Sequence, residues 1–167
     1  VVGPAASGKT GRPVSIARQF GGEVISADSM QVYRGMDVAT AKPSEEEKQG
    51  VPHHLMDCLD PGAPFSVADY AALAHKAIAD VFARGELPLL VGGTGLYVGA
   101  VLDDLRFTES KSDPALREKW SRFAEEKGGE ALLAELQKLD PETAARLHPN
   151  DRGRIIRAIE VCCLTGI

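Results

Sequence analysis

The first residues constrain the fold most, because residues 3–10 read GPAASGKT and fit the P-loop pattern G-x-x-x-x-G-K-[ST]. The two valines before them are typical of the end of a buried strand. In such a loop, inward backbone amides at a helix N-terminus bind a diphosphate or triphosphate. Lys9 adds positive charge for the outer phosphate, and Thr10 can bind Mg²⁺. The predicted phosphate site consists of Gly3, Pro4, Ala5, Ala6, Ser7, Gly8, Lys9 and Thr10.

Strand and helix patterns alternate after this loop. Apolar residues recur at helical spacing up to residue 20 and again over 66–83, where Ser66 is the expected N-cap. Residues 23–26 form a short apolar strand pattern, and residues 87–91 are entirely apolar, as expected of a strand buried on both faces. This alternation predicts an α/β fold, a P-loop NTPase-like parallel sheet flanked by helices.

The composition changes after residue 105 to charged helical segments separated by Gly128-Gly129 and Asp140-Pro141. We expect an α/β core over 1–107, truncated at its N-terminus, a helical insertion domain over 108–149, and a final helix over 150–167 that returns to the core. The 167 residues are enough for one such domain and its insertion.

Bulk properties exclude several protein classes. The net charge of −5 argues against a uniformly basic nucleic-acid-binding surface, although a local basic patch is compatible with it. Cys58, Cys162 and Cys163 are too few and too poorly spaced for a disulfide framework or a zinc site. No apolar run reaches membrane-spanning length, and no signal peptide is visible, so we expect a cytoplasmic protein without membrane association.

Two segments should meet at the sheet edge that carries the phosphate loop. Asp28 follows the predicted strand at 23–26, and the glycine-rich stretch 92–95 follows the strand at 87–91. Ligands of open α/β sheets bind at the carboxyl ends of the strands. Asp28 is therefore a candidate general base, the alternative being a simple turn cap. Arg154 and Arg157 share one face of the last helix, suited either to phosphate or to solvent.

Together with the P-loop, several longer strings resemble the tRNA dimethylallyltransferases. The resemblance covers nearly the whole chain, and no single motif carries it. The matching strings are ISADSMQVY at 25–33, GMD at 35–37, TAKP at 40–43, VPHHL at 51–55, FSVAD at 65–69, GGTGLY at 92–97 and LHPND at 147–151. Members of this family are considerably longer, so we expect the given sequence to lack the C-terminal part of the family.

The resemblance implies transfer of a dimethylallyl group from its diphosphate to the exocyclic amine of the adenosine 3′ of the anticodon, in tRNAs that read codons beginning with U. By the same match, Asp28 is the base, and Lys9, Thr10 with Mg²⁺, and Arg157 hold the diphosphate. The tRNA would contact Asp28, Ser29, Met30, Gln31, Thr94, Arg117, Gly153, Arg154, Ile155, Ile156 and Arg157. We expect a monomer whose partners are tRNA and dimethylallyl diphosphate.

Three departures from the family pattern stand out. Ala5 replaces the usual Thr of the loop, Gly11-Arg12-Pro13 replaces helix formers, and Gly153 stands where Gln or Arg is common. The alternative functions are an adenylate isopentenyltransferase acting on free nucleotides, a P-loop small-molecule kinase, and a non-catalytic tRNA-binding module. The strand at 87–91 ends in Gly-Gly and not in the Asp typical of a kinase, which disfavours the kinase alternative.

Overall fold

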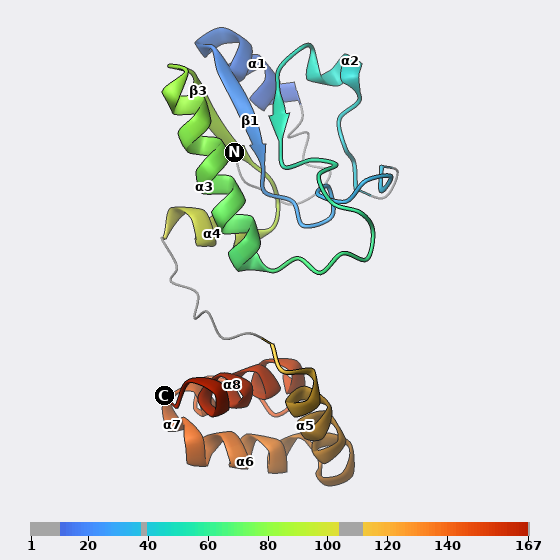
Figure 1. Ribbon diagram of the computed structural model, residues 1–167, viewed down its shortest axis with the longest axis vertical. Coiled ribbons are helices and arrows are strands. Elements are labelled where there is room, and N and C mark those ends of the chain that lie inside the picture. Colours follow the sequence, from blue (N-terminus) through green and yellow to red (C-terminus); the bar gives the residue numbers. More distant parts are fainter. Residues whose placement is uncertain (1–10, 38–39, 104–111, 167) are drawn as a thin grey trace. The chain divides into compact units, whose positions relative to one another are not determined.

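The computed structural model describes residues 11–37, 40–103 and 112–166. It divides into two compact units, Val1–Phe107 and Thr108–Ile167, and each is described by itself (Figure 1). The predicted phosphate loop, residues 3–10, lies outside the described residues, so its conformation and its Mg²⁺ site stay predictions.

The described part of the first unit contains a three-stranded parallel sheet in the order β2-β1-β3. In the register, Val24 of β1 lies opposite His53 of β2 and Leu89 of β3. This confirms the predicted α/β class with a parallel sheet flanked by helices (Figure 1). The elements are α1 (Gly11–Phe20), β1 (Gly22–Ser26), α2 (Glu45–Lys48), β2 (His53–His54), α3 (Val67–Ala83), β3 (Leu87–Val91) and α4 (Gly95–Leu102).

Alternation along β1 fixes which helix covers which face of the sheet. Val24 packs with Val14 and Ala17 of α1. The next residue, Ile25, points to the other face and packs in the cluster that contains Tyr70 and other residues of α3. The departure at Gly11-Arg12-Pro13 does not prevent α1, because proline is tolerated in the first turn of a helix.

The prediction that β3 is fully buried was wrong. Leu87 is exposed, and the other four residues of β3 are only partly buried. Among the described strands, β3 pairs with β1 alone and lies at the edge of the sheet. The apolar sequence therefore predicted the strand correctly. The burial of a strand depends on which neighbouring elements cover it.

Gly92 permits the close approach of two loops at the carboxyl edge of the sheet. A Cβ atom at this position would lie 2.2 Å from the carbonyl oxygen of Ala27. The surrounding backbone is fixed, because the Ala27 amide donates to Val91 O at 2.7 Å and the Thr94 amide donates to Ala27 O at 3.1 Å.

We therefore expect Gly92→Ala to destabilise the first unit by about 2 kcal/mol or more, since the clash is with backbone that cannot move aside. Urea denaturation of the full-length protein would measure this loss. Gly95→Ala is the matched control, because Gly95 has open space around it and opens a helix. Gly62→Ala is unsuitable, because Gly62 has a positive φ. A Gly92→Ala variant as stable as Gly95→Ala would contradict the prediction.

The second unit is a helical cluster with its own core. Leu132, Leu136, Ile155 and Ile159 are fully buried in it. The last helix packs against the first two helices of this unit, so residues 150–167 belong to the helical cluster and not to a separate segment. A return of this helix to the sheet stays a prediction. The helices are α5 (Pro114–Lys127), α6 (Gly129–Leu139), α7 (Pro141–Ala144) and α8 (Arg152–Thr165).

Candidate active site

Asp28 sits in a tight turn immediately after β1, at the carboxyl edge of the sheet. Its Oδ1 atom accepts hydrogen bonds from the backbone amides of Met30 at 2.9 Å and Gln31 at 3.4 Å. These contacts fix the carboxylate as an Asx turn does. Its Oδ2 atom has no hydrogen-bond partner within the described residues, which leaves one oxygen of a partly buried carboxylate for chemistry. The turn-cap and general-base interpretations of Asp28 are therefore compatible.

Thr94 joins the Asp28 turn to the loop after β3. The Thr94 Oγ1 atom accepts from the Ser29 amide at 3.0 Å and donates to Ser29 Oγ at 3.3 Å. Thr94 is also the N-cap residue of α4, although its side chain makes no cap hydrogen bond. Five predicted site residues thus come together at one sheet edge, and we call them the edge cluster: Asp28, Ser29, Met30, Gln31 and Thr94.

Both polar atoms of the Gln31 side-chain amide form hydrogen bonds. Its Oε1 accepts from Ser26 Oγ at 3.1 Å, and its Nε2 donates to the carbonyl of Thr40 at 3.0 Å. The carbonyl of Ser26 in turn accepts from the buried Tyr70 hydroxyl at 3.0 Å. Tyr70 stacks on Tyr97 with ring centroids 3.9 Å apart. The edge cluster is therefore connected through Ser26 to the stacked rings of Tyr70 and Tyr97.

Among the described residues, no group of three or more His, Cys, Asp or Glu side chains is placed to hold a metal ion. His53 and His54 instead form β2: His53 Nδ1 lies 2.8 Å from Val51 O, and His54 Nε2 hydrogen bonds to the Glu23 carboxylate. Within the same residues, no helix combines the length and apolar character that crossing a bilayer requires.

The second unit is organised around a buried carboxylate. Glu160 of α8 is fully buried, and its oxygens accept from Arg117 Nε and Nη2, both at 2.9 Å, and from Arg157 Nη1 at 2.6 Å. The backbone amide of Asp113 donates to the same carboxylate at 2.7 Å. Two predicted anion-binding arginines, one from α5 and one from α8, are therefore held by one acidic residue.

The arginines explain the electrostatics of Glu160. Burial alone would raise the pKa of the carboxyl group, but hydrogen bonds from Arg117, then Arg157 and the Asp113 amide, outweigh it and lower the pKa to about 2. The carboxylate is thus ionised at neutral pH, and it neutralises part of the positive charge of the two arginines.

We expect the helical unit to lose stability in acid. The folded pKa of Glu160 lies below the ordinary glutamate value of 4.5, so the contribution is complete above pH 4.5 and declines as pH falls toward 2. Urea midpoints of the full-length protein at pH 7 and pH 3 would measure it. A Glu160→Gln variant should show a smaller drop between these pH values. An equal drop in both proteins would contradict the prediction.

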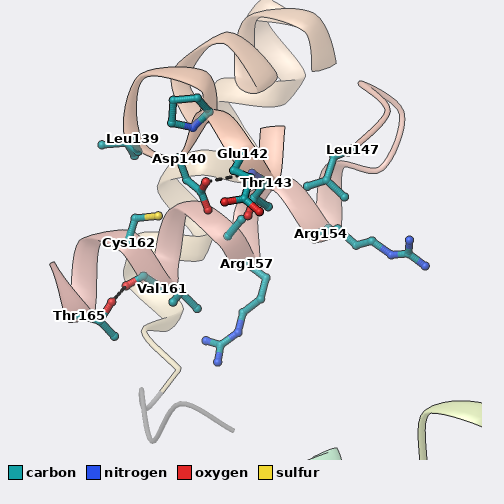
Figure 2. Close-up of a pocket in the computed structure, with 13 residues that line it drawn as sticks. Leu139, Asp140, Glu142, Thr143, Leu147, Arg154, Arg157, Val161, Cys162 and Thr165 are labelled. Atoms are coloured by element: carbon teal, nitrogen blue, oxygen red, sulfur yellow. Dashed lines mark hydrogen bonds between the residues drawn. The ribbon is translucent and has the colours of Figure 1, made fainter. Parts of the chain in front are cut away.

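The groove along α8 contains three of the predicted contact residues (Figure 2). It has a volume of about 1010 Å³ and lies between α7 and α8, with Gly153, Arg154 and Arg157 among its lining residues. Figure 2 shows the Arg154 and Arg157 side chains extending outward from α8. A Cβ atom at Gly153 would meet open space.

The predicted tRNA contacts of Ile155 and Ile156 stay predictions, and the structure buries both side chains. Ile155 is 0% exposed and Ile156 is 9% exposed, and both belong to the core of the helical unit. They share a short sequence segment with Arg154 and Arg157, but a helix places residues three positions apart on one face, so the two arginines lie on a different face from the buried isoleucines. A motif match over a whole segment does not separate these faces.

Two residues in these networks escaped the sequence reasoning. Local sequence patterns indicate a role for neither Glu160 nor Lys42. Lys42 donates to the Tyr33 carbonyl at 2.6 Å and to the carboxylates of Asp57 at 2.5 Å and Asp37 at 3.0 Å. The only available signal for Lys42 was its place in the TAKP string.

Known proteins share both the sequence and the fold. A tRNA dimethylallyltransferase of Geobacillus thermodenitrificans is 51% identical over 166 residues, which are 99% of this chain and 53% of that protein. The Bacillus subtilis protein of the same name is 49% identical over 166 residues, with the same shares of 99% and 53%. The chain thus spans about half the length of the curated relatives it matches.

Solved structures give the same result. The full-length tRNA isopentenylpyrophosphate transferase of Bacillus halodurans is 51% identical with a TM-score of 0.64, covering 99% of this chain and 55% of that one. A eukaryotic dimethylallyltransferase acting on tRNA has a TM-score of 0.84 at 32% identity, covering 99% and 41%.

Two family models match the sequence. The isopentenyl transferase model matches residues 1–59, and the IPP transferase model matches residues 31–167. The second match includes Gln31 and Thr94 of the edge cluster and the whole helical unit, and the first match includes Asp28, Ser29 and Met30. The chain therefore belongs to the IPP transferase family.

Proposed function

We propose that the protein transfers a dimethylallyl group from dimethylallyl diphosphate to the exocyclic amine of the adenosine 3′ of the anticodon, in tRNAs that read codons beginning with U. The observation that carries the proposal is the edge cluster, where Asp28, Ser29, Gln31 and Thr94 are joined by hydrogen bonds at the carboxyl edge of the sheet. The names of the relatives, which are tRNA dimethylallyltransferases, support the same reaction.

In this proposal Asp28 acts as the general base. The adenine amine attacks the first carbon of the dimethylallyl group, a nitrogen–carbon bond forms, and the carbon–oxygen bond to the diphosphate breaks. The amine proton passes to the Asp28 carboxylate, and the electron pair of the broken bond leaves with the diphosphate. The target base must leave its stack to enter the site, as in other base-modifying enzymes.

The leaving diphosphate requires positive charge where its own charge develops. The P-loop pattern assigns this role to the backbone amides of residues 3–10 and to Lys9, and Mg²⁺ to Thr10, and the resemblance adds Arg157. These assignments remain predictions, as do a monomeric state and a cytoplasmic location. Arg154 and Arg117, with partly exposed side chains, are suited to phosphate groups of an anticodon stem-loop.

An adenylate isopentenyltransferase is the second candidate, favoured by the match of residues 1–59 to the isopentenyl transferase model. Both activities would use a P-loop and a carboxylate base. The helical unit distinguishes them, because its outward arginines suit a large polyanion better than a free nucleotide.

A transfer assay on the full-length protein tests the proposal. It offers radiolabelled dimethylallyl diphosphate with Mg²⁺ and one of two acceptors, an anticodon stem-loop with the target adenosine or free AMP. We expect label on the stem-loop. Label on AMP alone would establish the second candidate, and label on neither, with phosphate transferred from ATP to a small molecule, would indicate a kinase.

A further inference from the structure

Lys42 has a buried ammonium group and lies outside the edge cluster. Its side chain is only 6% exposed, although Lys42 belongs to the loop between β1 and α2. Its ammonium group donates to three oxygens, the Tyr33 carbonyl at 2.6 Å, Asp57 Oδ1 at 2.5 Å and Asp37 Oδ1 at 3.0 Å. A lysine ammonium has three N–H donors, so these contacts satisfy it completely.

The partners of Lys42 belong to segments that hold Gln31 in place. The Asp57 amide donates to the Gln31 carbonyl at 3.1 Å. The Gln31 side chain donates to the carbonyls of Thr40 and Ala41, the two residues that precede Lys42. We call Lys42, Tyr33, Asp37 and Asp57 the lysine clamp. The clamp therefore joins three loop segments around the backbone of Gln31, whose amide reaches the Asp28 carboxylate.

Strained backbone accompanies the clamp. Ala41 has a φ of 47° and Asp57 a φ of 53°, both in the left-handed region that side chains with a Cβ rarely adopt. Each such residue costs about 1 kcal/mol or more and persists only where the surrounding contacts compensate for it. Here one strained residue precedes Lys42 and the other is its acidic partner, so the ion pairs hold both loops in this conformation.

The charge of the clamp is stable over the physiological range. Burial acts to lower the pKa of Lys42, but the hydrogen bonds and Coulombic attraction from Asp57 and Asp37 outweigh it and raise the pKa above its ordinary value. The titratable and charged groups that face the ammonium are these two carboxylates, both partly exposed. Removal of the lysine would leave carboxylates that water can solvate, so the loops would loosen without unfolding the core.

We propose that Lys42 is a positioning residue, whose clamp holds the turn after β1 so that Asp28 and Gln31 face the acceptor adenosine. This inference rests on the proposed prenyl transfer, and it adds a residue that does not touch the reacting atoms. A loosened turn would displace the base by a fraction of an ångström to an ångström, and a displacement of that size lowers the rate by up to about 100-fold.

The test compares Lys42→Met with Lys42→Arg in the full-length protein, with Lys76→Met as the control because Lys76 is exposed on α3. We expect Lys42→Met to lower kcat for stem-loop prenylation about 10- to 100-fold. The KM for dimethylallyl diphosphate should change less than about 2-fold, since the clamp does not include the predicted phosphate loop. Lys42→Arg should restore part of kcat, and Lys76→Met should match the unmodified protein.

A double-variant cycle separates positioning from general destabilisation. In an Asp28→Asn background, the Lys42→Met change should cost little further activity, because its effect acts through Asp28. Rates are normalised to the folded fraction from thermal unfolding. An unchanged kcat in Lys42→Met would overturn the inference, and so would a loss that is equally large with and without Asp28.

Amide hydrogen exchange gives an answer that does not depend on the reaction. We expect faster exchange at the Met30 and Gln31 amides in Lys42→Met than in Lys76→Met. Unchanged exchange at these two amides would overturn the proposed role of the lysine clamp, even if the enzyme is active. If the unmodified protein transfers no dimethylallyl group while exchange still rises in Lys42→Met, the proposed function fails and the clamp stands as a feature of the fold.

Discussion

Asp28→Asn is expected to lower kcat for prenyl transfer by about 100- to 10,000-fold, the usual range for loss of a general base. Asparagine keeps an oxygen where Oδ1 accepts from the Met30 and Gln31 amides, so the turn should persist. It cannot accept the proton of the adenine amine at neutral pH. The change thus removes the proton acceptor and preserves the conformation of the turn.

The Asp28→Asn measurement compares single-turnover rates on a stem-loop substrate. Asp60→Asn is the matched control, because Asp60 is an exposed surface carboxylate paired with Arg34 at 2.8 Å. Thermal unfolding midpoints of the two variants should agree closely. A kcat within about 3-fold of the unmodified protein would exclude Asp28 as the base.

Glu160→Ala is expected to destabilise the helical unit by about 3 kcal/mol. The buried carboxylate neutralises Arg117 and Arg157 and accepts from the amide of Asp113, the N-cap residue of α5. Breaking a buried ion pair by removing one partner typically costs about 3–5 kcal/mol. The lower end applies here, because the Arg117 and Arg157 side chains are 46% and 40% exposed and can regain water.

Hydrogen exchange of the α5 and α8 amides, together with urea midpoints, would measure this loss. Glu118→Ala is the matched control on α5, since its ion pair with Arg122 is solvent-exposed. Such surface pairs contribute at most about 1 kcal/mol. If Glu160→Ala and Glu118→Ala are equally stable, the buried carboxylate does not organise the unit.

Local patterns in the sequence predicted local structure well. Ser66 caps α3 with Asp69 in the capping-box position, and Asp113-Pro114 opens α5. These features depend on residues within one turn, so a short window contains all the information. The edge cluster followed from a further rule, that the carboxyl ends of parallel strands meet at one edge of the sheet.

Long-range pairing could not be predicted in the same way. Glu160 and Arg117 are 43 positions apart, and nothing in either local pattern indicates the other. Asp57 lies 15 positions from Lys42, in a loop whose conformation depends on a left-handed residue. The burial of β3 likewise depends on its neighbours in the sheet. Each of these features is a property of the folded chain, and sequence periodicity does not contain it.

The activity that we propose for this protein is prenylation of the exocyclic amine of one adenosine in a tRNA anticodon loop. The most direct measurement is mass spectrometry of nucleosides from a stem-loop incubated with the full-length protein, dimethylallyl diphosphate and Mg²⁺. We predict that one adenosine exchanges one amine hydrogen for a dimethylallyl group, and that Asp28→Asn strongly slows this change. An unmodified stem-loop together with prenylated AMP would contradict the claim.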